Sequence, residues 1–259
     1  MLYRLCALGT ILFCAVPNAS AASITPLKPY HNPIISGFAP DPSCIRVKGQ
    51  FFCVTSSFSA FPGIPVYTSR DLVQWQQIGV YPSVLIEHWA HLLLFTGNVL
   101  SRPEQLPQLA LVNQTTGGIW AATIREHKGT FYVTTTLVFD GEPQTNPDRW
   151  DNVSGDVSTT LRNGSSNLQL IFTNRDIFAK NGNGWSDPVH FSFVGYDTSL
   201  FWDDDGTAYI QGSHAWHIFP AIQQFKIDVN TGKALSEPII LWNGTGGIVS
   251  LFRNLIRDI

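Results

Sequence analysis

Two aspartates and a tryptophan recur at the same place in three similar stretches of this chain. The stretches are "DPSCIRVKGQFFCVTSS" from Asp41, "WAATIREHKGTFYVTTT" from Trp120 and "DTSLFWDDDGTAYIQGS" from Asp197. Two carboxyl groups brought face to face suit cleavage of a glycosidic bond, because one protonates the leaving oxygen while the other activates water or attacks carbon. An indole ring beside them can stack on the apolar face of a sugar. The three residues therefore raise the hypothesis of a sugar-cleaving site.

Asp41 stands between Pro40 and Pro42, which restrict the backbone and would pre-orient its side chain. The alternative is a turn or capping aspartate, which is the commoner role of an Asp next to Pro. The acidic run 203–205 before Gly206 predicts a turn, with metal binding as a second reading, although it lacks the ligand spacing of a calcium loop. No zinc-protease, phosphate-loop or nucleophile-elbow motif occurs, so we predict neither a metal nor a cofactor.

The elements that must position these residues are strands. Each stretch reads as a strand, a glycine turn at Gly49, Gly129 or Gly206, and a second strand that carries an aromatic residue after the turn. A recurring unit made only of strands predicts propeller blades, whose inner strands line a central channel. A β-sandwich is the alternative, but it gives no reason for polar or aromatic residues at one equivalent inner position. We therefore expect Asp41, Trp120 and Asp197 to converge at one end of that channel.

The composition fits one large globular domain or a piece of one. The chain has 259 residues, 44% hydrophobic and 14% charged, with a formal net charge of −3. This near-neutral balance offers no basic stripe, so we expect no nucleic-acid partner. No later segment is long and apolar enough to span a bilayer, so we expect no membrane partner once the leader is removed.

The first 21 residues read as a secretion signal. A short basic start, the apolar core "LCALGTILFCAV" and the small-residue site "ASA" predict cleavage before Ala22 and an extracellular location. Sequons at Asn113, Asn152, Asn163 and Asn243 fit a glycoprotein.

Removal of the leader would leave two cysteines, Cys44 and Cys53, which flank a predicted turn at Lys48-Gly49. In a regular hairpin they would be directly opposed, close enough for a disulfide. Two small buried hydrophobic side chains lying side by side are an equal alternative.

Several motifs in a common order resemble glycoside hydrolase family 43, most closely its β-xylosidase and α-L-arabinofuranosidase members. They are "NPIISGFAPDPSCIRV", "TSSFSAFPGIPVYTSRDLVQWQQIG", "VLSRPEQLPQL", "GGIWAATIREHKGTFYVTTT", "GWSDPVHF" and "YDTSLFWDDDGTAYI". The resemblance implies an all-β, five-bladed propeller and inverting hydrolysis of terminal xylosyl or arabinofuranosyl linkages in xylan or arabinoxylan. It does not separate the two sugars.

The resemblance also implies roles for single residues. Asp41 would be the general base that activates water, and Asp197 the second carboxylate, which orients the acid and keeps it protonated. Phe58 and Trp120 would be walls of the sugar pocket. The family's Trp-Ala-Pro is Trp120-Ala121-Ala122 here, and its Asp-Pro-Ser is Asp197-Thr198-Ser199, so each loses a rigidifying proline.

Two further departures from the family pattern concern whole segments. Residues 80–97, "VYPSVLIEHWAHLLLFTG", separate two motifs that run together in the family. We interpret them as an insertion, either a translated intron, if the source is eukaryotic, or a genuine loop. After "GTGG" at 244–247, residues 248–259 form a non-family tail, and no Glu follows Gly247 to match the family's general acid.

These departures give the expected organisation: a signal peptide (1–21) and a partial propeller domain (22–259) of roughly three blades. We expect a secreted glycosidase lineage whose chain, as written, is inactive and poorly folded. A non-catalytic carbohydrate-binding or vestigial fragment is the alternative. A third reading is a gene-model artefact, tested by a transcript joining Gly79 to Asn98 and continuing past Gly247.

Overall fold

The computed structural model describes residues 31–79, 97–139, 167–179, 184–215 and 219–244. The predicted signal peptide, residues 80–96 of the insertion, the 248–259 tail and two of the sequons, Asn152 and Asn163, lie outside the described residues. The described chain is all-β, as predicted, with two short 3₁₀ turns at Pro103–Gln105 and Pro107–Leu111. Within it, no helix is long and apolar enough to cross a membrane.

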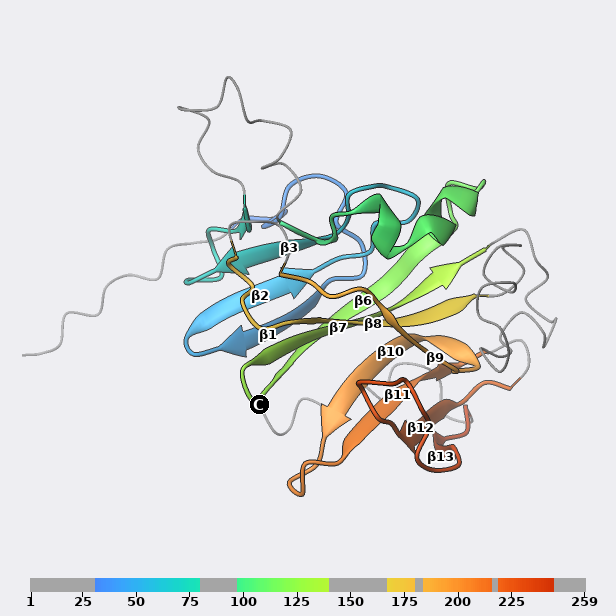
Figure 1. The fold of residues 1–259 in the computed structure, drawn as a ribbon. Helices are drawn as coiled ribbons and strands as arrows, with labels where there is room; N and C mark the ends of the chain where they lie inside the picture. Colours follow the sequence, from blue (N-terminus) through green and yellow to red (C-terminus); the bar gives the residue numbers. More distant parts are fainter. Residues whose placement is uncertain (1–30, 80–96, 140–166, 180–183, 216–218, 245–259) are drawn as a thin grey trace, which may run out of the picture.

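Three antiparallel sheets follow one another in sequence order (Figure 1). The first contains β1 (Ser43–Val47), β2 (Gln50–Val54), β3 (Gly63–Ser69), β4 (Gln76–Gln77) and β5 (Asn98–Leu100). The second contains β6 (Gly118–His127), β7 (Thr130–Val138), β8 (Leu168–Asn174) and β9 (Val189–Phe191). The third contains β10 (Gly195–Trp202), β11 (Ala208–His214), β12 (Ile222–Lys226) and β13 (Ile239–Trp242). Each sheet meanders outward from its first strand, which is how propeller blades are built. A ring of five blades stays a prediction.

Two of the predicted hairpin turns have the same geometry. Lys48 and Gly49 have φ angles of 48° and 83°, and Lys128 and Gly129 have 49° and 83°. Two consecutive residues with positive φ between directly paired strands form the turn whose twist matches a β-hairpin. The third turn, Asp203 to Thr207, is longer and is closed by the amide of Gly206 donating to Asp203 O at 2.8 Å. The acidic run therefore forms a turn, as its first reading predicted.

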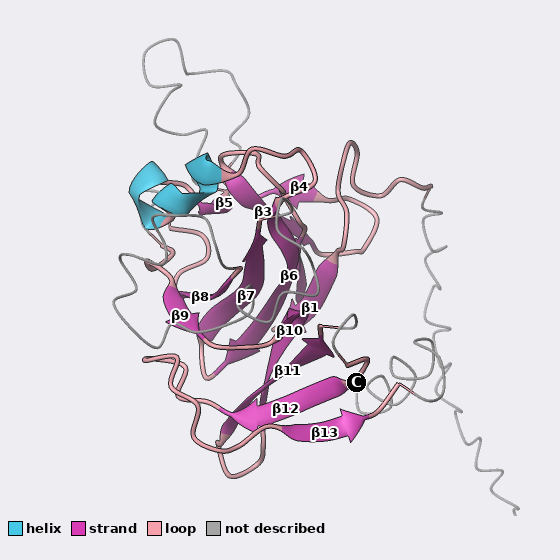
Figure 2. Ribbon diagram, turned by 90° about the vertical axis from the view of Figure 1, so that its right-hand side faces the viewer, coloured by secondary structure: helices cyan, strands magenta, loops and turns pink. Residues whose placement is uncertain are grey.

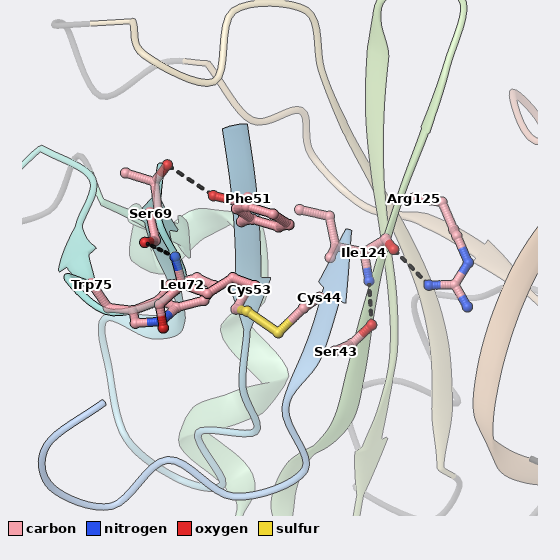
Figure 3. Close-up of a disulfide and its surroundings, with 10 residues drawn as sticks. Ser43, Cys44, Phe51, Cys53, Ser69, Leu72, Trp75, Ile124 and Arg125 are labelled. Atoms are coloured by element: carbon pink, nitrogen blue, oxygen red, sulfur yellow. Dashed lines mark hydrogen bonds between the residues drawn. A yellow bond between two sulfur atoms is a disulfide. The ribbon is translucent and has the colours of Figure 1, made fainter. Parts of the chain in front are cut away.

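Cys44 and Cys53 face each other across β1 and β2 and form a disulfide (Figure 3). Their Cα atoms are 4.1 Å apart. This resolves the two sequence readings in favour of the covalent link. The same close-up shows β1 beside β6, where the Ile124 amide donates to Ser43 Oγ at 3.2 Å.

Two separate cores join the sheets. The larger lies between the first and second sheets and includes Val54, Ile124 and Phe172, each fully buried. The smaller lies between the second and third sheets and includes Ile171 and Ile210. Because neighbouring residues on β8 enter different cores, the second sheet is buried on both faces and holds the other two together.

The fourth strand of the first sheet is split in two. β4 and β5 both pair with β3 (Figure 2), although residues 80–96 separate them in the chain. Val66 lies opposite both ends of the break: the Ile78 amide donates to Val66 O, and the Val66 amide donates to Gly97 O, each at 2.9 Å. Two residues opposing one is the pattern of a β-bulge. Ile78 and Gly97, which lie on either side of residues 80–96, therefore face Val66 as they would in a continuous bulged strand.

Candidate functional site

The first strands of the three sheets lie side by side. β6 contacts both β1 and β10. The Thr123 hydroxyl on β6 donates to Thr198 O on β10 at 2.7 Å, and the Ile124 amide reaches Ser43 at the start of β1. Asp41 precedes β1 by two residues, while Trp120 and Asp197 are third in β6 and β10. The three predicted residues therefore lie at the same end of three adjacent strands.

The backbone at this end adopts an unusual conformation. Asp41, Phe58, Ala121 and Asp197 have φ angles of 51°, 51°, 38° and 58°. Residues with a side chain seldom occupy this left-handed region, which costs of order 1–3 kcal/mol each. β6 and β10 also change pairing register, between Trp120 and Thr123 and between Tyr196 and Ser199. Strain and bulges concentrate at functional sites, where they redirect side chains.

Buried hydroxyl groups satisfy the backbone at these two bulges. The Thr135 hydroxyl donates to Trp120 O at 2.6 Å. The hydroxyls of Thr123 and Thr134 both donate to Thr198 O, at 2.7 and 2.6 Å. Each bulge turns a carbonyl out of the strand ladder, and a buried carbonyl without a donor would be costly. These threonines therefore stabilise the unusual backbone beside Trp120 and Asp197.

Asp41 is exposed, and its carboxylate is held on one side. Ser56 Oγ donates to Asp41 Oδ2 at 2.6 Å, and the same Oγ accepts the Ala121 amide at 2.7 Å. A short hydrogen bond to a carboxylate is a charge-assisted one. It fixes the side chain at the end of the inner strands.

Asp197 has a pKa raised above the ordinary value of an aspartate. The main cause is desolvation by surrounding protein atoms, and the second is the negative charge of Asp41. Its side chain still reaches solvent, so it is enclosed on several sides without being sealed. The charge effect shows that the two carboxyl groups lie close enough to interact. A raised pKa favours the protonated form, so Asp197 retains a proton to higher pH than an isolated aspartate would.

Two pairs of aromatic rings belong to the same strand ends as the two aspartates. The half-buried ring of Phe58 lies 5.8 Å from that of Phe38, which is 79% exposed. The half-buried ring of Trp120 lies 6.3 Å from that of Tyr196, and its Nε1 donates to Thr116 O at 2.8 Å. The backbone of Phe58 is joined to that of Ile119 by two hydrogen bonds of 3.0 Å, one in each direction. The structure therefore brings together all four sequence-predicted residues.

Sequence reasoning missed Ser56, Phe38 and Tyr196. Phe38 and Tyr196 stand within three residues of the predicted aspartates, so their proximity was a usable signal. Ser56 lies 15 residues from Asp41 in a stretch with two adjacent serines, and no pattern distinguishes them. No group of three or more metal-binding side chains gathers anywhere in the described ranges.

The chain belongs to the glycosyl hydrolases family 43, whose profile matches residues 30–252. It is 46% identical over 106 residues to a non-reducing end α-L-arabinofuranosidase of Bacteroides ovatus, covering 41% of this chain and 16% of that protein. It is 31% identical over 227 residues to a xylosidase/arabinosidase of Butyrivibrio fibrisolvens, covering 83% of this chain and 33% of that protein.

Solved structures of the same family share the fold. A family 43 protein from a capybara gut metagenome matches with a TM-score of 0.60 and 29% identity, over 86% of this chain and 35% of the other. A Bacteroides ovatus family 43 protein from a xyloglucan utilisation locus matches with a TM-score of 0.59 and 30% identity, over 84% and 33%. The chain thus spans about a third of the length of these relatives.

Proposed function

We propose that this chain carries the base half of an inverting glycosidase site for terminal xylosyl or arabinofuranosyl linkages. The observation that supports it best is the effect of the Asp41 charge on the pKa of Asp197, at the strand end that also carries Phe58 and Trp120. Asp41, held by Ser56, activates a water molecule, and Asp197 orients and tunes the acid. In an inverting mechanism the two reacting carboxyl groups stand about 6.5–9.5 Å apart to leave room for that water.

Phe58 and Trp120 form the walls of the sugar pocket in this proposal. Half-buried aromatic rings present a flat apolar face at little cost in side-chain entropy, and the CH face of a pyranose or furanose stacks on it. The substrate would be the end of a xylan or arabinoxylan chain. We also propose, from the leader sequence, that the protein is secreted.

We further propose that the residues of this chain supply the water-activating base and its partner carboxylate, so their contribution is greatest on substrates whose leaving group needs no proton. General acid–base assistance is worth about 10²–10⁴-fold, and it matters most when the leaving group is a sugar alcohol. A dinitrophenolate leaving group departs without being protonated, so a dinitrophenyl glycoside tests the base alone.

The experiment compares dinitrophenyl and methyl β-xylosides, and the corresponding arabinofuranosides, with the full chain. We expect slow hydrolysis of a dinitrophenyl glycoside, loss of that rate in Asp41→Asn, and slower hydrolysis of the methyl glycosides, whose leaving group must be protonated. Asp204→Asn, in the exposed turn after β10, is the matched control and should keep the wild-type rate. Equal rates for Asp41→Asn and wild type on the dinitrophenyl glycoside would contradict the role of Asp41.

The second candidate is a carbohydrate-binding protein without catalysis, favoured by the half-buried aromatic rings of Phe58 and Trp120. Calorimetric titration with xylo-oligosaccharides distinguishes the two. Binding that is lost in Trp120→Ala, together with no turnover of either activated glycoside, would establish binding alone.

A further inference from the structure

Ser56 holds the Pro40–Asp41 segment through both its backbone and its side chain. Its amide donates to Pro40 O at 3.0 Å, and its hydroxyl donates to Asp41 Oδ2 at 2.6 Å. Ser56 itself is only 2% exposed. One buried residue thus holds both the peptide group before Asp41 and the Asp41 carboxylate. A side chain at positive φ needs this kind of support from its surroundings.

The direction of the hydroxyl hydrogen bond is fixed. Ser56 Oγ accepts the Ala121 amide at 2.7 Å, and an amide can only donate. The single hydroxyl proton is then available for Asp41, which must be the acceptor. This arrangement engages Oδ2, which leaves Oδ1 as the oxygen available to take a proton from water.

Ser56 also connects Asp41 to the aromatic walls. Phe58 and Ile119 form an antiparallel β-bridge. Two residues further along the same pairing, Ser56 lies opposite Ala121. The backbones are so close here that a Cβ on Gly118 would collide with the carbonyl of Phe58. The Ser56 hydroxyl therefore acts where a backbone carbonyl would otherwise accept the Ala121 amide.

We propose that Ser56 is a positioning residue that sets the orientation of the Asp41 carboxylate and selects Oδ1 as the basic oxygen. The inference deepens the proposed function and rests on it for its catalytic consequence. The orientation of the Asp41 carboxylate by Ser56 does not depend on whether the chain hydrolyses a glycoside. A hydrogen bond to a charged group typically contributes enough to change a rate about 10–100-fold when one partner is removed.

The test uses the full chain with three substitutions at Ser56 and one control. Ser56→Ala removes the hydroxyl, Ser56→Thr retains it, and Ser56→Val matches Thr in size without it. Ser57→Ala is the control, because Ser57 Oγ accepts the Ile64 amide at 3.0 Å and does not contact Asp41. The ¹³Cγ resonance of Asp41, assigned by its disappearance in Asp41→Asn, reports the carboxylate directly. Exchange of the Ala121 amide reports the other bond.

We expect Ser56→Ala and Ser56→Val to move the Asp41 resonance and to speed Ala121 exchange, while Ser56→Thr and Ser57→Ala resemble wild type. On the dinitrophenyl glycoside, Ser56→Ala should lower kcat about 10–100-fold and change KM by less than about twofold. If Ser56→Ala does not fold, the Thr and Val pair decides the question.

Unchanged Asp41 and Ala121 signals in the variants without the hydroxyl would overturn the inference. So would a kcat that falls equally in Ser56→Thr and Ser56→Val. If the wild-type chain hydrolyses nothing while the two resonances respond as expected, the proposed function fails and the positioning role of Ser56 stands.

Discussion

The first two sheets and the third sheet are supported very differently. Among the described residues, 21 buried hydrophobic residues form the core of the first two sheets, and seven form the core beneath the third. The third sheet also leaves aliphatic side chains in solvent: Ile239, Ile240 and Leu241 on β13 are 56%, 48% and 47% exposed. Asp41 and Trp120 thus belong to a well-packed unit, and Asp197 to a thinly packed one.

This difference shows where the candidate site is weakest. Thr123 on β6 and Thr134 on β7 both donate to Thr198 O on β10, and Gln169 on β8 donates to Gly195 O at 2.6 Å. Beside these hydrogen bonds, the smaller core packs the third sheet against the second. Because elements with few buried apolar contacts open at low free energy, the third sheet should separate before the others. Displacement of Asp197 from the candidate site is then the first expected consequence of destabilisation.

The largest expected effect comes from a truncation in the larger core, compared with the same truncation in the smaller one. Phe172→Ala removes a fully buried ring from the larger core and should cost about 3–5 kcal/mol of unfolding free energy. Phe225→Ala makes the same truncation in the smaller core. Hydrogen exchange followed by mass spectrometry should show faster exchange in all three sheets for the first variant and only in β10–β13 for the second. The same exchange pattern in both would mean that the three sheets unfold as one unit.

An intermediate effect is expected on the pKa of Asp197, which lies in the third sheet and is influenced by Asp41 at the start of the first. Asp41→Asn removes a negative charge beside Asp197, so the ionised form of Asp197 becomes less unfavourable and its pKa should fall. The pKa should stay above the ordinary value, because desolvation is the larger cause and remains. Titration of the Asp197 ¹³Cγ resonance measures both points, with Asp204→Asn as control. An unchanged Asp197 pKa in Asp41→Asn would mean that the two carboxyl groups do not interact.

The smallest expected effect concerns the insertion. Deletion of residues 80–97 joins Gly79 to Asn98 and should leave β4 and β5 as one bulged strand opposite Val66. The variant should unfold cooperatively at a temperature no lower than that of the full chain, and the amide signals of β10–β13 should not move. Loss of a folded spectrum would show that the first sheet depends on the inserted residues.

Periodicity and turn residues predicted the strands, the hairpins and the opposed cysteines, because these follow from local chemistry around Lys48-Gly49 and its equivalents. The shared position of Asp41, Trp120 and Asp197 predicted that they would meet. The contribution of Ser56 could not be predicted, because two adjacent serines have the same local preferences and only tertiary contacts distinguish them. The segment that separates β4 from β5 could be recognised because it does not match the family pattern. That Ile78 and Gly97 both pair with Val66 could not be predicted, because it depends on tertiary contacts.

The one-residue bulges in β6 and β10 have a consequence for how such a site can change. Side chains alternate along a strand, so an extra residue reverses which face every later position presents. In β6 the buried positions are Ile119 before the bulge and Ala122 and Ile124 after it, so the alternation shifts by one residue beside Trp120. The extra residue keeps the core-facing side of β6 buried on both sides of the bulge, and deleting one residue there would turn one end of the strand away from the core.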